Sequence, residues 1–191
     1  MITAGRGRGR GGLSDLPATL RPVTFETDEA RFWALLEDAW AGVGPEANGA
    51  RAALAKRDPE EDAFDAAAEL EEHLDTVLAA LRRATEGLSS AELTALDRVV
   101  ERKLHDIDRR AVHEVTGGSD DGFLYARGFI VALGREFYEA VAGDPRTAVP
   151  DAECEALCYF FAHLHADLYG GFPGTGSGIS RETATNATGW A

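Results

Sequence analysis

Residues 117–136 read GGSDDGFLYARGFIVALGRE, and this stretch decides the fold. Ser119 is of a type that caps helix N-termini, and the two aspartates after it complement the positive end of a helix dipole. From there to about Ala142, a helix would be apolar on most of its sides. Such a helix must be covered on most of its sides too, so the stretch predicts the central helix of a helical bundle.

Arg127 is the exception within this apolar helix, because helical spacing puts it on the face of Phe123 and Phe137. An unpaired charge in an apolar core is very costly, so we expect a carboxylate to pair with Arg127. The candidates on this helix and on the one before it are Asp97, Glu101, Asp120 and Asp121. We favour an ion pair that holds two helices in register.

A binding or catalytic pocket is the alternative interpretation of the same stretch. In that case Arg127 or Arg135 would bind an anion, and one of the aspartates would act as a base. The candidate polar cluster consists of Ser119, Asp120, Asp121, Arg127, Arg135 and Glu136. The two interpretations differ in whether Arg127 is sealed in the core or lines an open cavity.

Helical spacing of apolar residues continues on both sides of this stretch, and no segment alternates as a strand would. Ser89 and Glu92 have the spacing of a capping box. The predicted helices are 28–41, 58–83, 90–116, 120–142 and 151–168, while 45–57 fit either a short helix or a linker. We therefore expect an all-α, single-domain bundle of about five helices over residues 24–170.

The two ends of the chain differ from the middle in composition. Residues 1–23 are rich in Gly and Arg, and residues 171–191 are rich in Gly, Ser and Thr. Neither segment shows apolar periodicity, so we expect a disordered leader and a flexible tail. The alternatives are an arginine-rich arm for an acidic partner or RNA at the leader, and a Trp190 that packs on the core or anchors a partner at the tail.

The charge of the chain limits its partners. The 191 residues carry a formal net charge of −14, which repels phosphate backbones and anionic membranes, so we expect no nucleic-acid or membrane partner. Residues 58–75 contain nine carboxylates and no Lys or Arg, and form either a solvated surface or a docking site for a basic protein. Two cysteines, no signal-like start and no long apolar run predict a soluble cytoplasmic protein.

Two groups of possible metal ligands have simpler explanations. The candidates are Cys154, Cys158 and His165 on the last helix, and Glu101, His105 and Asp108 on the helix before the central one. The first group extends over too many helical turns to share one ion, and the second lacks the Glu-x-x-His spacing of a di-iron site. We expect buried cysteines and a solvated helix face, with no metal and no cofactor.

The chain resembles a bacterial family called domain of unknown function 4240, which is common in actinobacteria. The resemblance rests on Ser-Asp-Asp-Gly-Phe at 119–123, Arg-Gly at 127–128, Gly-Arg-Glu at 134–136, Asp-Pro at 144–145 and Phe-Trp at 32–33. It covers roughly residues 28–170. Because the family carries no established activity, the resemblance supports the fold rather than a function.

The sequence favours a non-catalytic protein-interaction or regulatory module whose acidic surface takes a basic or neutral protein partner. The alternative is a small-molecule-binding protein or an enzyme of actinobacterial specialised metabolism, with its polar pocket around 119–135. No nucleophile elbow, Walker A loop, zincin helix or Ser-His-Asp order occurs in the chain. The sequence therefore leaves open whether the protein is an enzyme, and it does not decide the oligomeric state.

Overall fold

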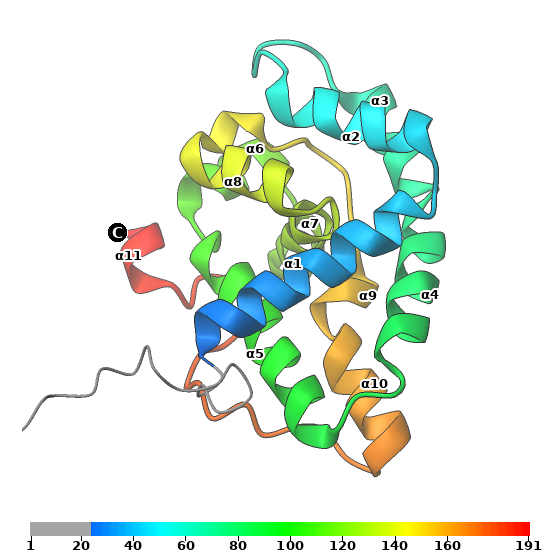
Figure 1. The fold of residues 1–191 in the computed structure, drawn as a ribbon. Helices are drawn as coiled ribbons and strands as arrows, with labels where there is room; N and C mark the ends of the chain where they lie inside the picture. The colour runs from blue at the N-terminus through cyan, green and yellow to red at the C-terminus, as the bar shows by residue number, and fades with distance from the viewer. Residues whose placement is uncertain (1–23) are drawn as a thin grey trace, which may run out of the picture.

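Helix α7 (Asp120–Ala132) lies in the middle of the molecule, among the other helices (Figure 1). The computed structural model describes residues 24–191, so the predicted leader at 1–23 lies outside the described residues. Nine of the thirteen residues of α7 are buried. The prediction of a central helix that begins after Ser119 is therefore confirmed.

The described residues form eleven α-helices and one short 3-10 helix, and they contain no strand. The helices before α7 are α1 (Phe25–Ala41), α2 (Pro45–Lys56), α3 (Phe64–Glu71), α4 (Leu74–Thr85), α5 (Ser90–Asp106) and α6 (Arg110–Thr116). Those after it are α8 (Arg135–Gly143), η3 (Pro145–Thr147), α9 (Glu155–Cys158), α10 (Phe160–Tyr169) and α11 (Ala187–Trp190). The all-α class is confirmed, but the expected number of about five helices is wrong.

The observed helices are shorter than the predicted ones, because local hydrogen bonds and residues with positive φ interrupt the helical backbone. Asp58 and Asp62 each accept a hydrogen bond from a backbone N–H two residues later, which competes with helix formation and delays α3. Gly134 takes a φ of 91°, a conformation that favours glycine, and it separates α7 from α8. Asp151 also has a positive φ, of 57°, and the last helical segment begins only after it, at α9.

The predicted helix caps are present. Ser89 and Glu92 form a reciprocal capping box at the start of α5. Ser119 accepts a hydrogen bond of 3.2 Å from the backbone N–H of Gly122 at the start of α7. These bonds satisfy N–H groups that have no partner within the helix, so they define where α5 and α7 begin.

Helices α5, α7, α9 and α10 pack together and position the groove described below. α10 lies along α5, and α9 lies across α7, while α1 covers α4 and α5 and α2 covers α8 (Figure 1). Gly128 of α7 allows this close approach, because a Cβ atom there would lie 2.7 Å from Cys158 Sγ. At the C-terminal end of α7, Trp40 Nε1 donates a hydrogen bond of 2.7 Å to the carbonyl oxygen of Ala132.

The C-terminal tail is irregular from Gly170 to Asn186, but hydrogen bonds fix it to the helices. The expectation of a flexible tail therefore differs from the structure, because the tail's polar groups find partners in α5 and α7 that local sequence does not reveal. Trp190 packs on the core, against Phe123 and His113, which was one of its two predicted roles.

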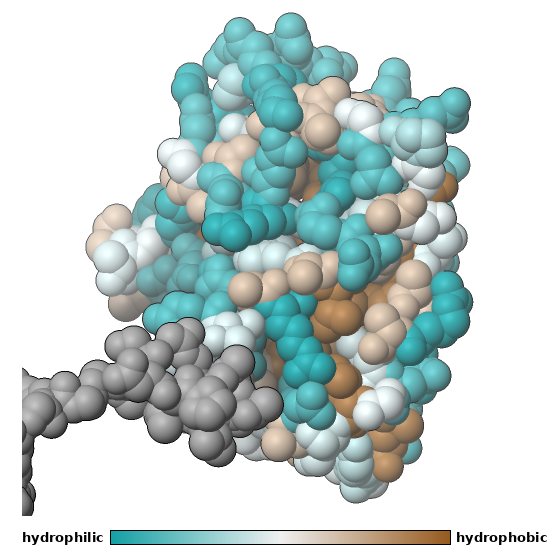
Figure 2. Space-filling model, in the orientation of Figure 1, coloured by the Kyte–Doolittle hydropathy of each residue, from teal (hydrophilic) through white to brown (hydrophobic). Residues whose placement is uncertain are grey.

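The surface is mostly hydrophilic on the face that Figure 2 shows, above all over α2 and α3. Hydrophobic residues gather toward the lower right of this view, where α4 and α10 lie in Figure 1. No helix among residues 24–191 has the length and apolar character needed to cross a membrane.

Candidate functional site

Arg127 is fully buried, and its hydrogen-bond partners are two carbonyl oxygens and the hydroxyl of Thr183 rather than a carboxylate. It donates hydrogen bonds of 3.0 Å to Leu104 O and 2.9 Å to Arg181 O, and its guanidinium lies 4.8 Å from the centre of the Phe123 ring. Burial lowers the pKa of Arg127, and the nearby charge of Asp108 opposes this effect. The expectation that one of four named carboxylates pairs with Arg127 is therefore wrong, since the tail supplies acceptors in their place.

Asp108 makes a second group of contacts between the helices and the C-terminal tail. Its carboxylate is buried between α5 and α6 and accepts hydrogen bonds from the tail. The donors are the backbone N–H groups of Ala184, Thr185 and Asn186 and the indole Nε1–H of Trp190, at 2.8–3.1 Å. This use of Asp108 accounts for the break in the predicted helix 90–116.

The other residues of the predicted polar cluster lie in two further places. Ser119 and Asp120 are at the start of α7, where Asp120 O accepts a hydrogen bond of 2.6 Å from Thr183 of the tail. Arg135 and Glu136 are exposed at the start of α8, where Arg135 pairs with Glu139 at 2.6 Å. The structure therefore does not bring Arg127 and Arg135 to one cavity.

Asp121, the remaining member of the cluster, lies near a different set of side chains. Its charge acts on Tyr125, one turn further along α7. The carboxylate of Glu155 also contacts the Tyr125 hydroxyl and raises its pKa. Asp121 is not among the residues that line the clefts described below.

A buried ion pair joins α5 to the tail beside these clefts. Arg181 pairs with Asp97 at 2.7 Å, and both side chains are less than 10% exposed. Arg181 also donates 2.6 Å to Cys158 O and lies 5.3 Å from the centre of the Tyr159 ring. Burial raises the pKa of Asp97, while Arg181 opposes the shift. Sequence spacing did not reveal Arg181, because it lies in a segment with no apolar pattern.

The possible metal ligands are engaged in other contacts. Glu101 accepts hydrogen bonds from Thr175 and Ser177, and His165 bonds to Ser90 and to Gly171 O. Both cysteines are buried and free. Within residues 24–191, no group of three His, Cys, Asp or Glu side chains is arranged to hold a metal ion.

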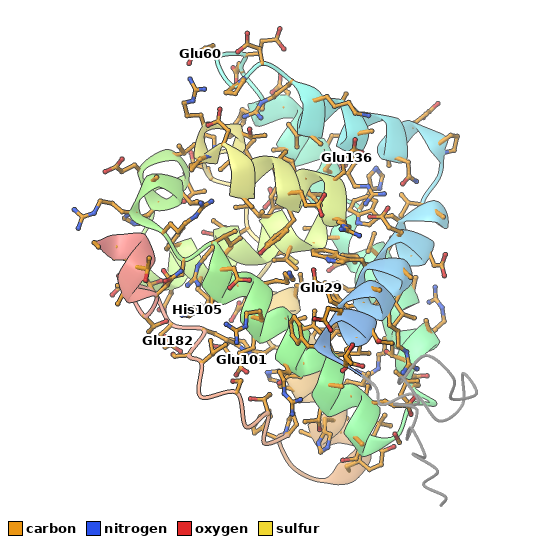
Figure 3. All side chains as sticks on the ribbon, turned by 60° about the vertical axis from the view of Figure 1, so that its left-hand side comes forward. Glu29, Glu60, Glu101, His105, Glu136 and Glu182 are labelled. Carbon is orange, nitrogen blue, oxygen red and sulfur yellow. The ribbon has the colours of Figure 1, made fainter. Side chains whose placement is uncertain are left out.

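A cleft of about 590 Å³ lies between α5, the α9–α10 segment and the tail. Its lining combines carboxylates, aromatic rings and one arginine, which are Asp97, Glu101, Glu155, Tyr159, His163, Phe172, Arg181 and Glu182. Figure 3 shows Glu101 and Glu182 near each other, where the tail runs along α5. We call this space the main cleft.

Two further clefts share Glu155 with the main cleft. One, of about 340 Å³, continues along α9 and α10 to Arg82. The other, of about 310 Å³, runs between α9 and the α3–α4 segment and is lined by four more carboxylates, Glu71, Glu72, Asp75 and Glu153. The three clefts meet at Glu155, and we refer to them together as the acidic groove.

The charge around the acidic groove is strongly negative. The whole chain carries −14, and residues 1–23 contribute four Arg and one Asp, so residues 24–191 carry −17. The predicted acidic segment 58–75 ends at this groove, because Glu71, Glu72 and Asp75 line one of its branches. A positively charged group would therefore be attracted to it.

The model of the family described as protein of unknown function (DUF4240) matches residues 61–164. This match includes Asp97, Asp108 and Arg127 and ends before the tail that binds them. No curated protein and no solved structure matches the chain significantly. The family match covers more than half of the chain, and it agrees with the resemblance carried by residues 119–136, so the protein belongs to the DUF4240 family.

Proposed function

We propose that the protein is a non-catalytic interaction or regulatory module that binds a positively charged segment of a partner protein in the acidic groove. The observation that carries this proposal is the convergence of three clefts on Glu155, with carboxylates along two of them. A groove with several branches suits an extended segment better than a single small ion. Two buried free cysteines fit a reducing compartment, so we infer a cytoplasmic location.

Electrostatics support a basic partner. With −17 on residues 24–191, long-range attraction raises the association rate of cationic segments and opposes polyanions. The two arginines that line the groove do not cancel this field. Arg181 is paired with Asp97, and Arg82 is paired with Asp167 and Glu86.

The alternative function, a small-molecule binder or enzyme built on residues 119–135, has less support. Arg127 is sealed between α5, α7 and the tail, so its guanidinium has no open side for an anion. Arg135 is an exposed member of an i, i+4 ion pair with Glu139. Neither arginine faces an aspartate across a cavity, as a site for acid–base chemistry requires.

The proposal is tested by fluorescence anisotropy with a labelled peptide of alternating Lys and Ala, at low and at physiological salt. We expect saturable binding that weakens with salt, and no binding of the matching Glu–Ala peptide. The double substitution Glu72→Gln and Glu155→Gln should weaken binding about fivefold or more, because each removes a carboxylate from the groove without changing its shape.

The matched control is Glu46→Gln with Glu60→Gln, which removes the same charge from exposed positions outside the groove. Its binding should stay within about twofold of the wild type. Equal weakening in both double variants would mean that net charge alone attracts the peptide, and it would overturn the assignment of the groove. Absence of binding at low salt would overturn the function itself.

A further inference from the structure

We infer that the main cleft is a pocket for an arginine side chain of the partner, whose guanidinium sits beside Glu101 and Glu182 and against the ring of Phe172. This inference rests on the proposed function and names the group that the partner inserts. The proposed ligand is a guanidinium group on a polypeptide, not any basic group.

The charges that line the main cleft are not balanced. Asp97, Glu101, Glu155 and Glu182 face a single arginine, Arg181. Arg181 is itself paired with Asp97 and donates a hydrogen bond to the carbonyl oxygen of Cys158. Three carboxylates therefore remain without a cation among the residues that line this cleft.

Asp97 adds to the negative charge of the main cleft. Its side chain is only 4% exposed and lines the main cleft. Arg181 pairs with Oδ2, and Oδ1 is buried away from solvent. The carboxylate therefore contributes negative potential to the cleft wall.

Glu101 is oriented by the tail in a way that suits a bound cation. Its Oε2 accepts hydrogen bonds of 2.8 Å from Thr175 and 2.5 Å from Ser177. These two hydroxyls hold the carboxylate against the tail. The side chain is preorganised, so a bound guanidinium does not have to order it.

Aromatic rings at the rim supply the flat surface on which a guanidinium stacks. Phe172 is 70% exposed, and its ring packs edge-on against His163 at 5.5 Å. His163 in turn lies 6.2 Å from Tyr159. An exposed phenylalanine ring is unfavourable in water. A planar cation stacked on the ring would cover it and would also pair with the nearby carboxylates.

The choice of arginine over lysine follows from this combination of groups. A guanidinium offers five N–H donors in a plane, can bond two carboxylates and stacks on aromatic faces. An ammonium is more strongly hydrated and lacks the flat face. Within this molecule, Arg181 already binds in this manner, paired with Asp97 and lying over Tyr159.

The test compares two labelled peptides, one alternating Arg and Ala and the other alternating Lys and Ala, by anisotropy on the full-length chain. We expect the arginine peptide to bind at least about fivefold more tightly. Phe172→Ala and, separately, Glu101→Gln should reduce this preference to less than about twofold. Phe64→Ala removes another exposed phenylalanine, on α3, and should leave the preference unchanged.

The outcomes separate this inference from the proposed function. Equal binding of both peptides would overturn the arginine pocket and leave the acidic groove standing as a site for basic segments. An arginine preference that survives both Phe172→Ala and Glu101→Gln would also overturn it. Failure of both peptides to bind would overturn the proposed function as well. Free N-acetyl-arginine amide should compete only weakly, and competition as strong as that of the peptide would assign the site to a small molecule instead.

Discussion

The guanidinium of Arg127 donates a hydrogen bond of 2.9 Å to the backbone carbonyl of Arg181, which lies 54 residues later in the chain. The side chain of Arg181 then reaches Asp97 of α5. Two arginines in series thus connect the central helix, the tail and the helix that lines the main cleft. Because the tail forms one wall of this cleft, Arg127 and Arg181 position part of the proposed binding site.

Replacing Arg127 by Met should destabilise the protein. The substitution keeps most of the apolar bulk but leaves the carbonyl oxygens of Leu104 and Arg181 buried without their donors. We expect the free energy of unfolding to fall by about 2–4 kcal/mol, since each unsatisfied buried acceptor costs about 1–3 kcal/mol. Urea unfolding followed by circular dichroism measures this. Arg135→Met, in an exposed ion pair, should cost at most about 0.5 kcal/mol, and a similar loss in both variants would contradict the assigned role.

Asp108 should make the tail sensitive to acid. Burial raises the pKa of Asp108, but the hydrogen bonds from Asn186 and Trp190 outweigh it and leave the pKa below its ordinary value. A carboxyl group whose pKa is lowered in the folded state stabilises that state at pH values above its unfolded pKa of about 4. This contribution disappears as the pH falls through the lower folded pKa.

The measurement for Asp108 is the free energy of unfolding of the wild type and of Asp108→Asn at several pH values. At pH 7 the variant should be about 2 kcal/mol less stable, because it loses charge-assisted hydrogen bonds to three backbone N–H groups and one indole. The difference should shrink progressively below about pH 4. A difference that stays constant from pH 7 to pH 3 would show that ionisation of Asp108 does not stabilise the tail.

Gly128 and Gly49 offer a matched pair of glycine-to-alanine substitutions inside helices. A Cβ on Gly128 would collide with Cys154 O and lie 2.7 Å from Cys158 Sγ, whereas nothing lies within 4 Å of a Cβ on Gly49. Gly128→Ala should therefore lower the melting temperature and cost about 1–3 kcal/mol or more. Gly49→Ala should raise stability by about 0.5–1 kcal/mol, because alanine favours helix. Two stabilising substitutions would mean that α7 and α9 pack less closely than the structure describes.

The two cysteines should be unreactive in the folded protein. Burial raises the pKa of Cys154 to about 11 and that of Cys158 to about 12, so few thiolates form at pH 8. Reaction with Ellman's reagent should be at least about 100-fold slower in the native protein than in urea, where the pKa returns to about 8.5. Rapid labelling of one thiol without denaturant would indicate that the α9 segment opens in solution.

Several local features of the fold could be predicted because their causes lie within a few residues of each other. The capping box of Ser89 and Glu92 and the cap at Ser119 were recognisable from spacing, and they begin α5 and α7 as expected. Two of the predicted helices are divided in the structure, because Gly134 takes a positive φ between α7 and α8 and Asp108 binds the tail between α5 and α6; apolar spacing registers neither feature. Asp108 in particular binds a segment more than 70 residues away.

By itself, the sequence determined an all-α fold around one apolar helix, and it determined that this helix buries Arg127. Both follow from apolar periodicity and helix capping, which depend on residues only one or two helical turns apart. Only the tertiary structure decided that backbone carbonyls accept hydrogen bonds from Arg127 and that the tail's Arg181 pairs with Asp97. The main cleft is likewise a product of tertiary structure, since α5, α9–α10 and the tail each contribute one wall. Contacts between such distant segments depend on how the helices pack, and they leave no periodic signal in the chain.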